Sequence, residues 1–550
     1  MPQKQSLFIA LSFFIIKMYG SNVAKIPITI KSKFPLSSAG IIFSTTQAIS
    51  RTFPLVEGYL DQSNFGGNKN GTTYIPFSIS GALIINDNCK ALALQPDGKI
   101  IVAGYTTNGT ATYFALARYL TNGQLDPSFG QSGTRAGTQY IPFSISGTAT
   151  ALTCDQIAAV AVQPDGKIVV AGLSTNTTTK KPCYCAIARF TSSGQIDTSF
   201  GQSGTRAGTQ YISFSICNAA NVYDQATTIA LQPDGKIIIA GLTTNSTQLP
   251  CYAAIARFTS AGKLDTSFGQ TGSRAGTQYI PFSISRVTTT GNINDQITSI
   301  LVQADGKIVT AGSSNTKTTL PCYYAVARFT TSGQLDTSFG QSSTYAGTNY
   351  IPFSISGATT INDQSLTTGI QSDGSIILGG TTQNPTSSFC ALARFTSTGQ
   401  LDVTFGQTGL RAGTTYVPFN IANQATTYDY ITSLTIQSDN SIITTGFSSN
   451  TTNITTNNYT AYITTTRFTV NGSLDQNFGK IGTAQAGTTY IPFGIANTTI
   501  KSDVAYALGL ESKGNIVLAG SSKTSNASYF CAARFINLAP NLSTSIIYGL

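Results

Sequence analysis

The sequence contains no histidine among its 550 residues. Histidine is the base of Ser-His-Asp triads and of Cys-His pairs, so both catalytic arrangements are excluded. Zinc sites built from cysteine and histidine are excluded as well, and no CxxC motif occurs. Any enzymatic chemistry would have to use aspartate, tyrosine, lysine or cysteine.

Charged residues are also scarce, at 10% of the chain, and the formal net charge is +10. Residues 1–57 hold six basic side chains against Glu57 alone, and the remaining excess is spread thinly. Four arginines recur in one motif position and could form a basic stripe: Arg135, Arg206, Arg274 and Arg411. Because no dense Lys/Arg patch occurs, we expect no nucleic-acid partner.

Long apolar runs are nearly absent. The exception, Leu7 to Ile16, follows Lys4 and is too short to span a bilayer as a helix. This pattern is typical of a secretory signal. We therefore predict a signal peptide over 1–24 and a linker over 25–57. The protein would be secreted, periplasmic or at the cell surface; an uncleaved anchor and a buried strand are the alternatives.

Cysteine is present in an odd number, nine residues. Cys183, Cys251 and Cys322 share one motif position, six residues before a recurring arginine. Equivalent positions in successive repeats lie apart, so we expect small buried residues rather than a disulfide set. A pair between Cys154 and Cys183 is the alternative.

The sequence does contain one unit written seven times. Its Gln-x-Asp-Gly-like start occurs at Gln95, Gln163, Gln232, Gln303, Gln371 and Gln437, with a degenerate copy at Glu511. An arginine follows in every copy: Arg118, Arg189, Arg257, Arg328, Arg394, Arg467 and Arg534. The LDxxFG motif that should follow Arg534 stands instead at Leu60 to Gly66. A unit split between the termini predicts a closed ring.

The sequence pattern of each unit predicts four strands and no helix. In the third copy these are Thr227 to Gln232, Lys236 to Gly241, Tyr252 to Phe258 and Thr277 to Ser285, where Pro281 indicates a sheet edge. A four-stranded sheet cannot bury both faces alone, but sheets packed around an axis can. A linear solenoid or a string of sandwiches would have whole units at both ends.

The predicted fold is therefore all-β, a seven-bladed β-propeller of repeats about 70 residues long. It would occupy 58–535, with 58–80 completing the last blade and 536–550 forming a tail.

The motifs QPDGKI, ARF and LDxSFG together resemble the delta-60 repeat family of β-propellers. The resemblance covers about 58–535. It implies a propeller fold and a setting outside the cytoplasm, and it brings no catalytic residues. The aromatic AGTxYIPF segment in each unit is a departure from the family pattern.

Nearly all 22 acidic residues belong to the repeat. Three sets recur: the LDxxFG aspartates (Asp61, Asp126, Asp197, Asp265, Asp336, Asp402, Asp475), the turn aspartates (Asp97, Asp165, Asp234, Asp305, Asp373, Asp439) and seven that stand eight residues before the Gln position (Asp87, Asp155, Asp224, Asp295, Asp363, Asp429, Asp503). Only Glu57 and Glu511 remain. No private carboxylate pair is left for acid–base catalysis, so we expect no enzyme, no catalytic residues and no cofactor.

The recurring arginine and the LDxxFG aspartate are predicted to have a structural role. They stand eight residues apart across a tight turn, which would bring Arg189 to Asp197 and Arg257 to Asp265. The split unit would bring Arg534 to Asp61.

The seven aspartates before the Gln position support two hypotheses. They would ring one mouth of a central channel and hold Ca²⁺ or a cationic group, because Ca²⁺ favours oxygen ligands. The alternative, which we favour, is that each caps its loop by accepting backbone N–H groups.

The function that follows is an exported scaffold, expected to be a monomer, that binds a protein or another surface ligand. Its specificity would lie in the variable loops Gly147 to Cys154, Arg286 to Asn294 and Ser448 to Asn458. The alternative is a carbohydrate-binding or carbohydrate-active propeller, lectin-like or lyase-like, that uses the channel mouth. A belt of the AGTxYIPF tyrosines could stack on sugars, although about half of these aromatic residues should be core. A cytoplasmic scaffold is the third hypothesis.

Overall fold

A computed structural model describes most of the repeat region. The described residues are 59–66, 71–75, 77, 86–108, 111–141, 154–175, 183–214, 223–244, 251–280, 294–315, 322–341, 346–351, 362–384, 386–418, 428–449, 461–479, 486–491, 502–524 and 527–537. The chain divides into two units, Met1–Leu55 and Val56–Leu550, and all described residues belong to the second. The predicted signal peptide and linker lie outside the described residues and stay predictions.

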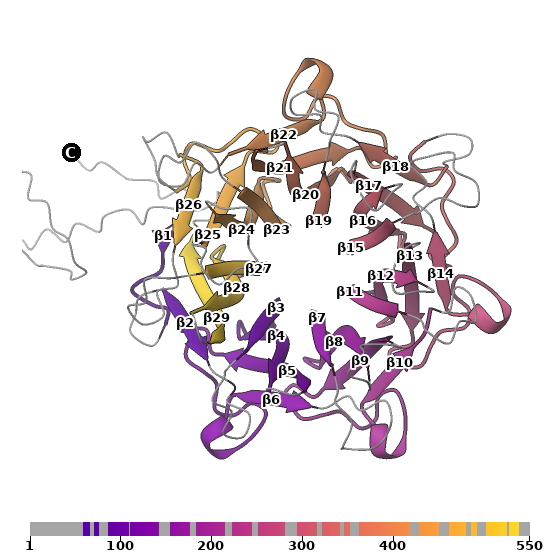
Figure 1. Ribbon diagram of the computed structural model, residues 1–550, viewed down its shortest axis with the longest axis vertical. Coiled ribbons are helices and arrows are strands. Elements are labelled where there is room, and N and C mark those ends of the chain that lie inside the picture. Colours follow the sequence, from indigo (N-terminus) through magenta and orange to yellow (C-terminus); the bar gives the residue numbers. More distant parts are fainter. Residues whose placement is uncertain are drawn as a thin grey trace, which may run out of the picture. The chain divides into compact units, whose positions relative to one another are not determined.

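The described elements are strands and short 3₁₀ helices (Figure 1). Two strands precede the first full repeat: β1 (Tyr59–Leu60) and β2 (Thr72–Ile75). The first three repeats form β3 (Asn88–Leu94), β4 (Ile100–Thr107), β5 (Thr112–Tyr119), η1 (Gly133–Arg135), β6 (Thr138–Ile141); β7 (Gln156–Val162), β8 (Ile168–Ser174), β9 (Tyr184–Phe190), η2 (Gly204–Arg206), β10 (Thr209–Ile212); and β11 (Tyr223–Leu231), β12 (Ile237–Thr244), β13 (Cys251–Phe258), η3 (Gly272–Arg274), β14 (Thr277–Ile280).

The later repeats follow the same order of elements. They form β15 (Asn294–Val302), β16 (Ile308–Asn315), β17 (Cys322–Phe329), β18 (Thr348–Ile351); β19 (Gln364–Ile370), β20 (Ile376–Gln383), β21 (Ser388–Phe395), η5 (Gly409–Arg411), β22 (Thr414–Val417); β23 (Tyr428–Ile436), β24 (Ile442–Ser449), β25 (Ala461–Phe468), β26 (Thr488–Ile491); and β27 (Ser502–Leu510), β28 (Ile516–Lys523), β29 (Ser528–Ile536).

Neighbouring strands within a repeat pair antiparallel, as in β11–β12–β13–β14. Single parallel pairings, such as Cys251 with Asn294, join some successive repeats at their strand ends. The all-β prediction is confirmed, and the strands form sheets like propeller blades. No helix among the described residues is long and apolar enough to cross a membrane.

The Gln-x-Asp-Gly motif forms the turn between the first and second strands. In the third repeat the Gln232 N–H donates to Lys236 O (2.9 Å), and the Gly235 N–H donates to Gln232 O (2.9 Å). Asp234 accepts from the Lys236 N–H (3.1 Å), as the sequence predicts for a turn aspartate. Gly235 has φ +80°, and Asn440 takes this left-handed position in the sixth repeat.

The second strand is the buried centre of each sheet. Residues 237–241 of β12 are fully buried, which the unbroken apolar run predicts. Gly241 faces a bulge in β11, where a Cβ atom would lie 1.9 Å from the Gln225 carbonyl oxygen. A side chain cannot fit there, so the recurring Ala-Gly ending is a packing requirement.

The hydrophobic core lies between successive repeats. One cluster joins Val169 and Ile187 of the second repeat to Ile237, Ile239 and Ala254 of the third. These apolar faces are buried by the neighbouring sheet, and burial of this kind is the main favourable term in folding. Each repeat therefore depends on its neighbours for a core.

The strands from the two ends of the repeat region pair with each other. β2 pairs antiparallel with β29, Thr72 opposite Ala533, and β1 pairs with the end of β29 (Figure 1). Arg534 Nη2 lies 2.8 Å from Asp61 Oδ2, and both side chains are buried. One core cluster also combines β4 and β5 with β28 and β29.

The C-terminal boundary differs from the predicted one at residue 535. β29 continues to Ile536, and Asn537 is fully buried. Asn537 Oδ1 accepts from Arg467 Nη1 (3.0 Å), and its Nδ2 donates to Gly514 O (2.9 Å). These two residues belong to the folded repeat region and not to a tail.

Asp61→Ala should destabilise the protein strongly, because it leaves Arg534 buried without its partner. Loss of one member of a buried ion pair costs about 3–5 kcal/mol. Thermal unfolding followed by circular dichroism measures the effect. Asp97→Ala, at an exposed turn, is the matched control and should change the melting temperature little; equal melting temperatures for both variants would contradict the role of this pair.

Candidate functional site

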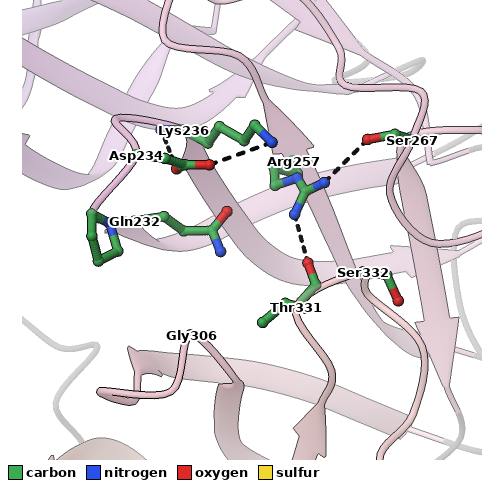
Figure 2. A pocket seen from close by; sticks show the side chains of 9 residues that line it. Gln232, Asp234, Lys236, Arg257, Ser267, Gly306, Thr331 and Ser332 are labelled. Atoms are coloured by element: carbon green, nitrogen blue, oxygen red, sulfur yellow. Dashed lines mark hydrogen bonds and ion pairs between the residues drawn. The ribbon is translucent and has the colours of Figure 1, made fainter.

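A pocket opens between the third and fourth repeats, beside the turn that joins β11 to β12. Its volume is about 440 Å³. Figure 2 shows it from close by, with the turn residues on one side and the neighbouring repeat on the other. Its lining is Gln232, Pro233, Asp234, Lys236, Arg257, Ser267, Gly306, Thr331 and Ser332. The pocket therefore combines the three recurring motifs of one repeat with the next repeat.

Arg257 is the centre of this junction. Its Nε lies 2.9 Å from Asp265 Oδ2, and its Nη2 donates to Ser267 Oγ (3.3 Å). Its Nη1 donates to Thr331 O of the next repeat (2.6 Å), as Figure 2 shows. The guanidinium also lies over the Phe268 ring, with 4.6 Å from Cζ to the ring centroid. The arginine therefore joins two repeats as well as pairing within its own.

Asp265 is held in its ionised form by this arrangement. Burial acts to raise its pKa, but hydrogen bonds from Ser267 and the charges of Arg257 and Lys236 outweigh it, so the pKa of Asp265 is lowered. Lys236 Nζ lies 3.4 Å from Asp265 Oδ2 and 3.4 Å from Asp234 Oδ2. The sequence analysis did not predict that Lys236 would contact both aspartates. The Asp-Gly-Lys motif places the lysine two residues after Asp234, which was the available signal.

The other predicted pairs have the same geometry. Arg189 Nε lies 2.9 Å from Asp197 Oδ2, and Arg534 contacts Asp61 across the two ends of the repeat region. The pKa of Asp197 and of Asp61 is lowered in the same way, against burial, by hydrogen bonds and by the arginine charge. The structure thus brings together every arginine and aspartate that we predicted to pair.

The charges in the pocket of Figure 2 are already satisfied by one another. Arg257 and Lys236 both contact carboxylates, and Arg257 also donates to Ser267 and Thr331. Gln232 is 9% exposed, and its Oε1 has no hydrogen-bond partner among the described residues. This pocket is built as a structural junction and presents little uncompensated charge to a ligand.

The seven aspartates of the proposed ring are all buried, at 0–1% exposure. Asp224 Oδ2 accepts from Ser213 Oγ (2.8 Å) and from the Phe214 N–H (2.9 Å), and Asp87 Oδ2 accepts from the Phe77 N–H (2.8 Å). Ser174 of the second strand donates to Asp155 (2.5 Å). Serines of the second strand make the same bond to Asp295, Asp429 and Asp503. The serine contacts stay inside one repeat, whereas Asp224 and Asp87 reach residues that follow the outermost strand of the preceding sheet, β10 and β2.

The calcium hypothesis therefore lacks a gathered set of ligands. Among the residues that the structure describes, no three His, Cys, Asp or Glu side chains lie close enough to hold a metal ion. For Asp87 and Asp224, the backbone contacts at Phe77 and Phe214 match the alternative, in which the aspartate caps a neighbouring segment. Calcium binding by these aspartates stays a prediction, which a calcium titration tests.

In six of the seven repeats the tyrosine of the AGTxYIPF-like segment packs on a second aromatic ring. Tyr279 of β14 meets Tyr252 of β13 edge to face, with 6.0 Å between centroids, and Tyr211 meets Tyr184 at 5.5 Å. Tyr279 also lies against the core between repeats. The same pairing occurs at Tyr74, Tyr140, Tyr350 and Tyr416, and Tyr74 is 50% exposed. These tyrosines are thus partly core and partly surface.

An arginine joins this aromatic pair in four repeats. Arg274 of η3 donates to the Tyr279 hydroxyl (3.1 Å), and its Cζ lies 5.5 Å from the ring centroid. The equivalent bonds are Arg135 to Tyr140, Arg206 to Tyr211 and Arg411 to Tyr416. The recurring TRAG-like arginines therefore form local clusters with tyrosine, which sequence spacing alone did not reveal.

The described cysteines are free thiols, including Cys154 and Cys183. A disulfide between these two, the alternative considered from sequence, is wrong for this structure. Burial raises the pKa of the Cys183 thiol to about 12 and that of Cys322 to about 12. Such thiols are inert packing residues at neutral pH. The variable loops expected to carry specificity lie almost wholly outside the described residues.

The fold and these motifs define a repeat protein of the β-propeller class. Five segments match the model of the family "Domain of unknown function (DUF5122) beta-propeller": residues 95–129, 163–200, 232–268, 303–339 and 371–405. These five matches are consistent with a delta-60-like repeat propeller family, and the predicted resemblance is confirmed. No curated protein matches the sequence.

Solved structures with a similar arrangement of strands include three proteins titled as carbohydrate enzymes. They are the polysaccharide lyase Uly1 (12% identity, 82% of this chain and 90% of that chain, TM-score 0.43), the Penicillium chrysogenum alpha-L-arabinanase (10%, 68% and 92%, 0.34) and the Trypanosoma rangeli sialidase (7%, 84% and 56%, 0.31). At these identities and scores no residue role passes to this chain.

The prediction that the protein is not an enzyme is nevertheless contradicted. That prediction was inferred from the observation that nearly all carboxylates belong to the repeated motifs. Structures of similar fold include a lyase, an arabinanase and a sialidase, so a propeller scaffold does not argue against catalysis.

The stability of the protein should decrease as the pH rises from about 4 to about 6. Burial raises the pKa of Asp87 to about 6 and that of Asp224 to about 6, above the ordinary 3.8. Within this window the folded protein binds protons that the unfolded chain has released, so each carboxylate destabilises the fold by roughly 2–3 kcal/mol at neutral pH. Urea midpoints at pH 4.5, 5.5 and 7 measure the slope.

Asp224→Asn removes one of these groups and should flatten the dependence in this window. Asp97→Asn, at an exposed turn, is the control variant for the loss of a carboxylate. A slope that does not differ between wild type and Asp224→Asn would show that Asp224 titrates normally. The LDxxFG aspartates Asp197 and Asp265 affect stability below pH 4, because their pKa values are lowered.

Proposed function

We propose that this protein is a closed, seven-bladed β-propeller that binds carbohydrate. The closure rests on the pairing of β1 and β2 with β29 and on the core shared by β4, β5, β28 and β29. Arg534 Nη1 also donates to Thr121 O of the first repeat, as Arg257 does to the repeat that follows it. A ring removes free sheet edges, which would otherwise pair with other chains.

The observation that carries the binding function is the cluster of an arginine with two aromatic rings on the outer strands. In the third repeat it consists of Arg274, Tyr279 and Tyr252. Its members are partly exposed, and the tyrosine hydroxyl accepts from the guanidinium. The arginine orients the tyrosine and keeps its polar end at the surface.

This combination suits a sugar ring. The C–H face of a sugar packs on an aromatic side chain, and its hydroxyls accept hydrogen bonds from a guanidinium, which has five donors. In the four repeats that have such a cluster, its aromatic rings lie on the third and fourth strands. The proposed site is therefore on the outer strands and not at the channel mouth, which was the location expected from the sequence.

Repetition of the cluster favours a repetitive ligand. Arg135, Arg206, Arg274 and Arg411 present similar groups on four repeats. A polysaccharide that contacts several weak sites at once gains overall affinity without new contacts, because the later contacts form within one complex. A polymer of sugars is thus a better partner for this surface than a single sugar or a globular protein.

The test is binding to an array of neutral and acidic polysaccharides, followed by calorimetry on those retained. We expect a variant with Arg135, Arg206, Arg274 and Arg411 all changed to Gln to bind about tenfold more weakly or worse. Each tyrosine loses the guanidinium that orients it. The melting temperature should change little, because the four side chains are partly exposed.

A variant with Lys513 and Lys523 changed to Gln controls for loss of positive charge away from the clusters, and it should bind as the wild type does. The retained polysaccharides are also incubated with the protein, and reducing ends and unsaturated products are measured, which detects hydrolysis or elimination. Silence across the array, together with capture of a defined protein partner, would overturn the proposal in favour of a protein-binding scaffold.

A further inference from the structure

One junction between repeats differs from the others in charge. After the turn that follows the recurring arginine, most repeats carry glutamine: Gln124, Gln195, Gln334 and Gln400. The Nε2 groups of Gln195, Gln334 and Gln400 donate to the carbonyls of Gly130, Gly269 and Gly340 in the preceding repeat. In the third repeat this position is Lys263. Lys263 puts a positive charge where four other repeats have a neutral amide.

Lys263 lies in a pocket with a second cation. The pocket has a volume of about 580 Å³ and is lined by Gly201, Gln202, Ser203, Thr205, Arg206 and Lys263. Its size is within the range of small-molecule sites. No carboxylate lines it, and Lys263 makes no ion pair among the described residues. Two basic side chains therefore face one cavity without an acidic neighbour in its wall.

The preceding junction is a natural comparison. Its pocket, about 710 Å³, is built from the same positions and contains Arg135, Gln131 and Gln195. There the glutamine stands where the next junction has Lys263. The two pockets share an arginine that bonds a tyrosine hydroxyl, Arg135 to Tyr140 and Arg206 to Tyr211. They differ by one full charge in an otherwise repeated frame.

The carboxylates nearest in sequence do not cancel this charge. Asp265, two residues after Lys263, is buried and contacts Arg257 and Lys236. Asp197 is buried against Arg189 and Lys167. Both aspartates are thus occupied by other cations, and the pocket keeps a positive potential that attracts an anion.

We propose that the pocket of Arg206 and Lys263 binds the anionic group, a carboxylate or a sulfate ester, of an acidic polysaccharide. Ser203, Thr205 and Gln202 line the same cavity and offer hydrogen bonds to the hydroxyls of that sugar unit. The neighbouring rings of Tyr211 and Tyr184 would contact the next unit of the chain. This inference rests on the proposed function and adds the class of sugar and its anchoring point.

The experiment compares three proteins by calorimetry at low and at physiological ionic strength. The ligands are an oligogalacturonate, a sulfated oligosaccharide of similar length and a neutral oligosaccharide. Lys263→Gln restores the residue that other repeats carry, so it should fold normally. We expect it to weaken binding of the preferred anionic ligand about tenfold at low salt, with a smaller effect at high salt because the contact is screened.

Gln195→Lys is the matched variant that creates a second copy of the pocket. It should raise the number of anionic sugar units bound per chain and leave binding of the neutral ligand unchanged. The uronate and sulfate arms show which anion is preferred. Free sulfate or galacturonate monomer is a further probe, and binding of the monomer as tightly as the oligosaccharide would contradict a polysaccharide site.

The outcomes separate the two proposals. If no oligosaccharide binds any of the proteins, the proposed carbohydrate function fails. If the neutral and anionic ligands bind wild type equally, and Lys263→Gln changes neither, carbohydrate binding holds and the anion pocket is overturned.

Discussion

The structure depends on the buried arginine of each repeat. Arg257 neutralises Asp265, stacks on Phe268 and donates to the backbone of the following repeat. A buried charge of this kind is expensive unless every donor is used, so the arginine makes the repeat fold only with its neighbour in place. The hydrophobic clusters, which also span adjacent repeats, strengthen the same dependence. Stability and architecture thus follow from one contact made again at each junction.

The sequence predicted this framework well, because each part has a local signal. The turn at Gln232 to Lys236 follows from Asp and Gly, the buried strand β12 from its unbroken apolar run, and the pair of Arg257 with Asp265 from hairpin spacing. The strand that completes β29 was visible as a motif missing at one end and present at the other. A single sequence is enough to predict contacts of this kind, because the contacting residues keep a fixed spacing within one hairpin or one turn.

The candidate sites were harder to predict because they depend on side-chain direction. The sequence placed Asp224 near the start of an inner strand, yet its carboxylate binds Ser213 and Phe214, which follow the outermost strand of the preceding repeat. Arg274 and Tyr279 lie in one recurring segment, but their cluster also needs Tyr252 from β13, and the pocket of Lys263 joins two repeats. Lys263 occupies a position where other repeats have glutamine. That difference indicates a binding site only once the cavity around Lys263 is known.

The buried amide of Asn537 has a consequence for how this chain can vary. In the six other repeats the arginine Nη1 reaches a main-chain carbonyl of a neighbouring repeat, an atom that every amino acid possesses. At Arg467 the acceptor is the side chain of Asn537, which a single codon change can remove. Most junctions therefore tolerate a change of the accepting residue, whereas the junction of Arg467 requires one particular side chain. At the junction between the sixth and seventh repeats, the contact is kept only as long as asparagine is kept at position 537.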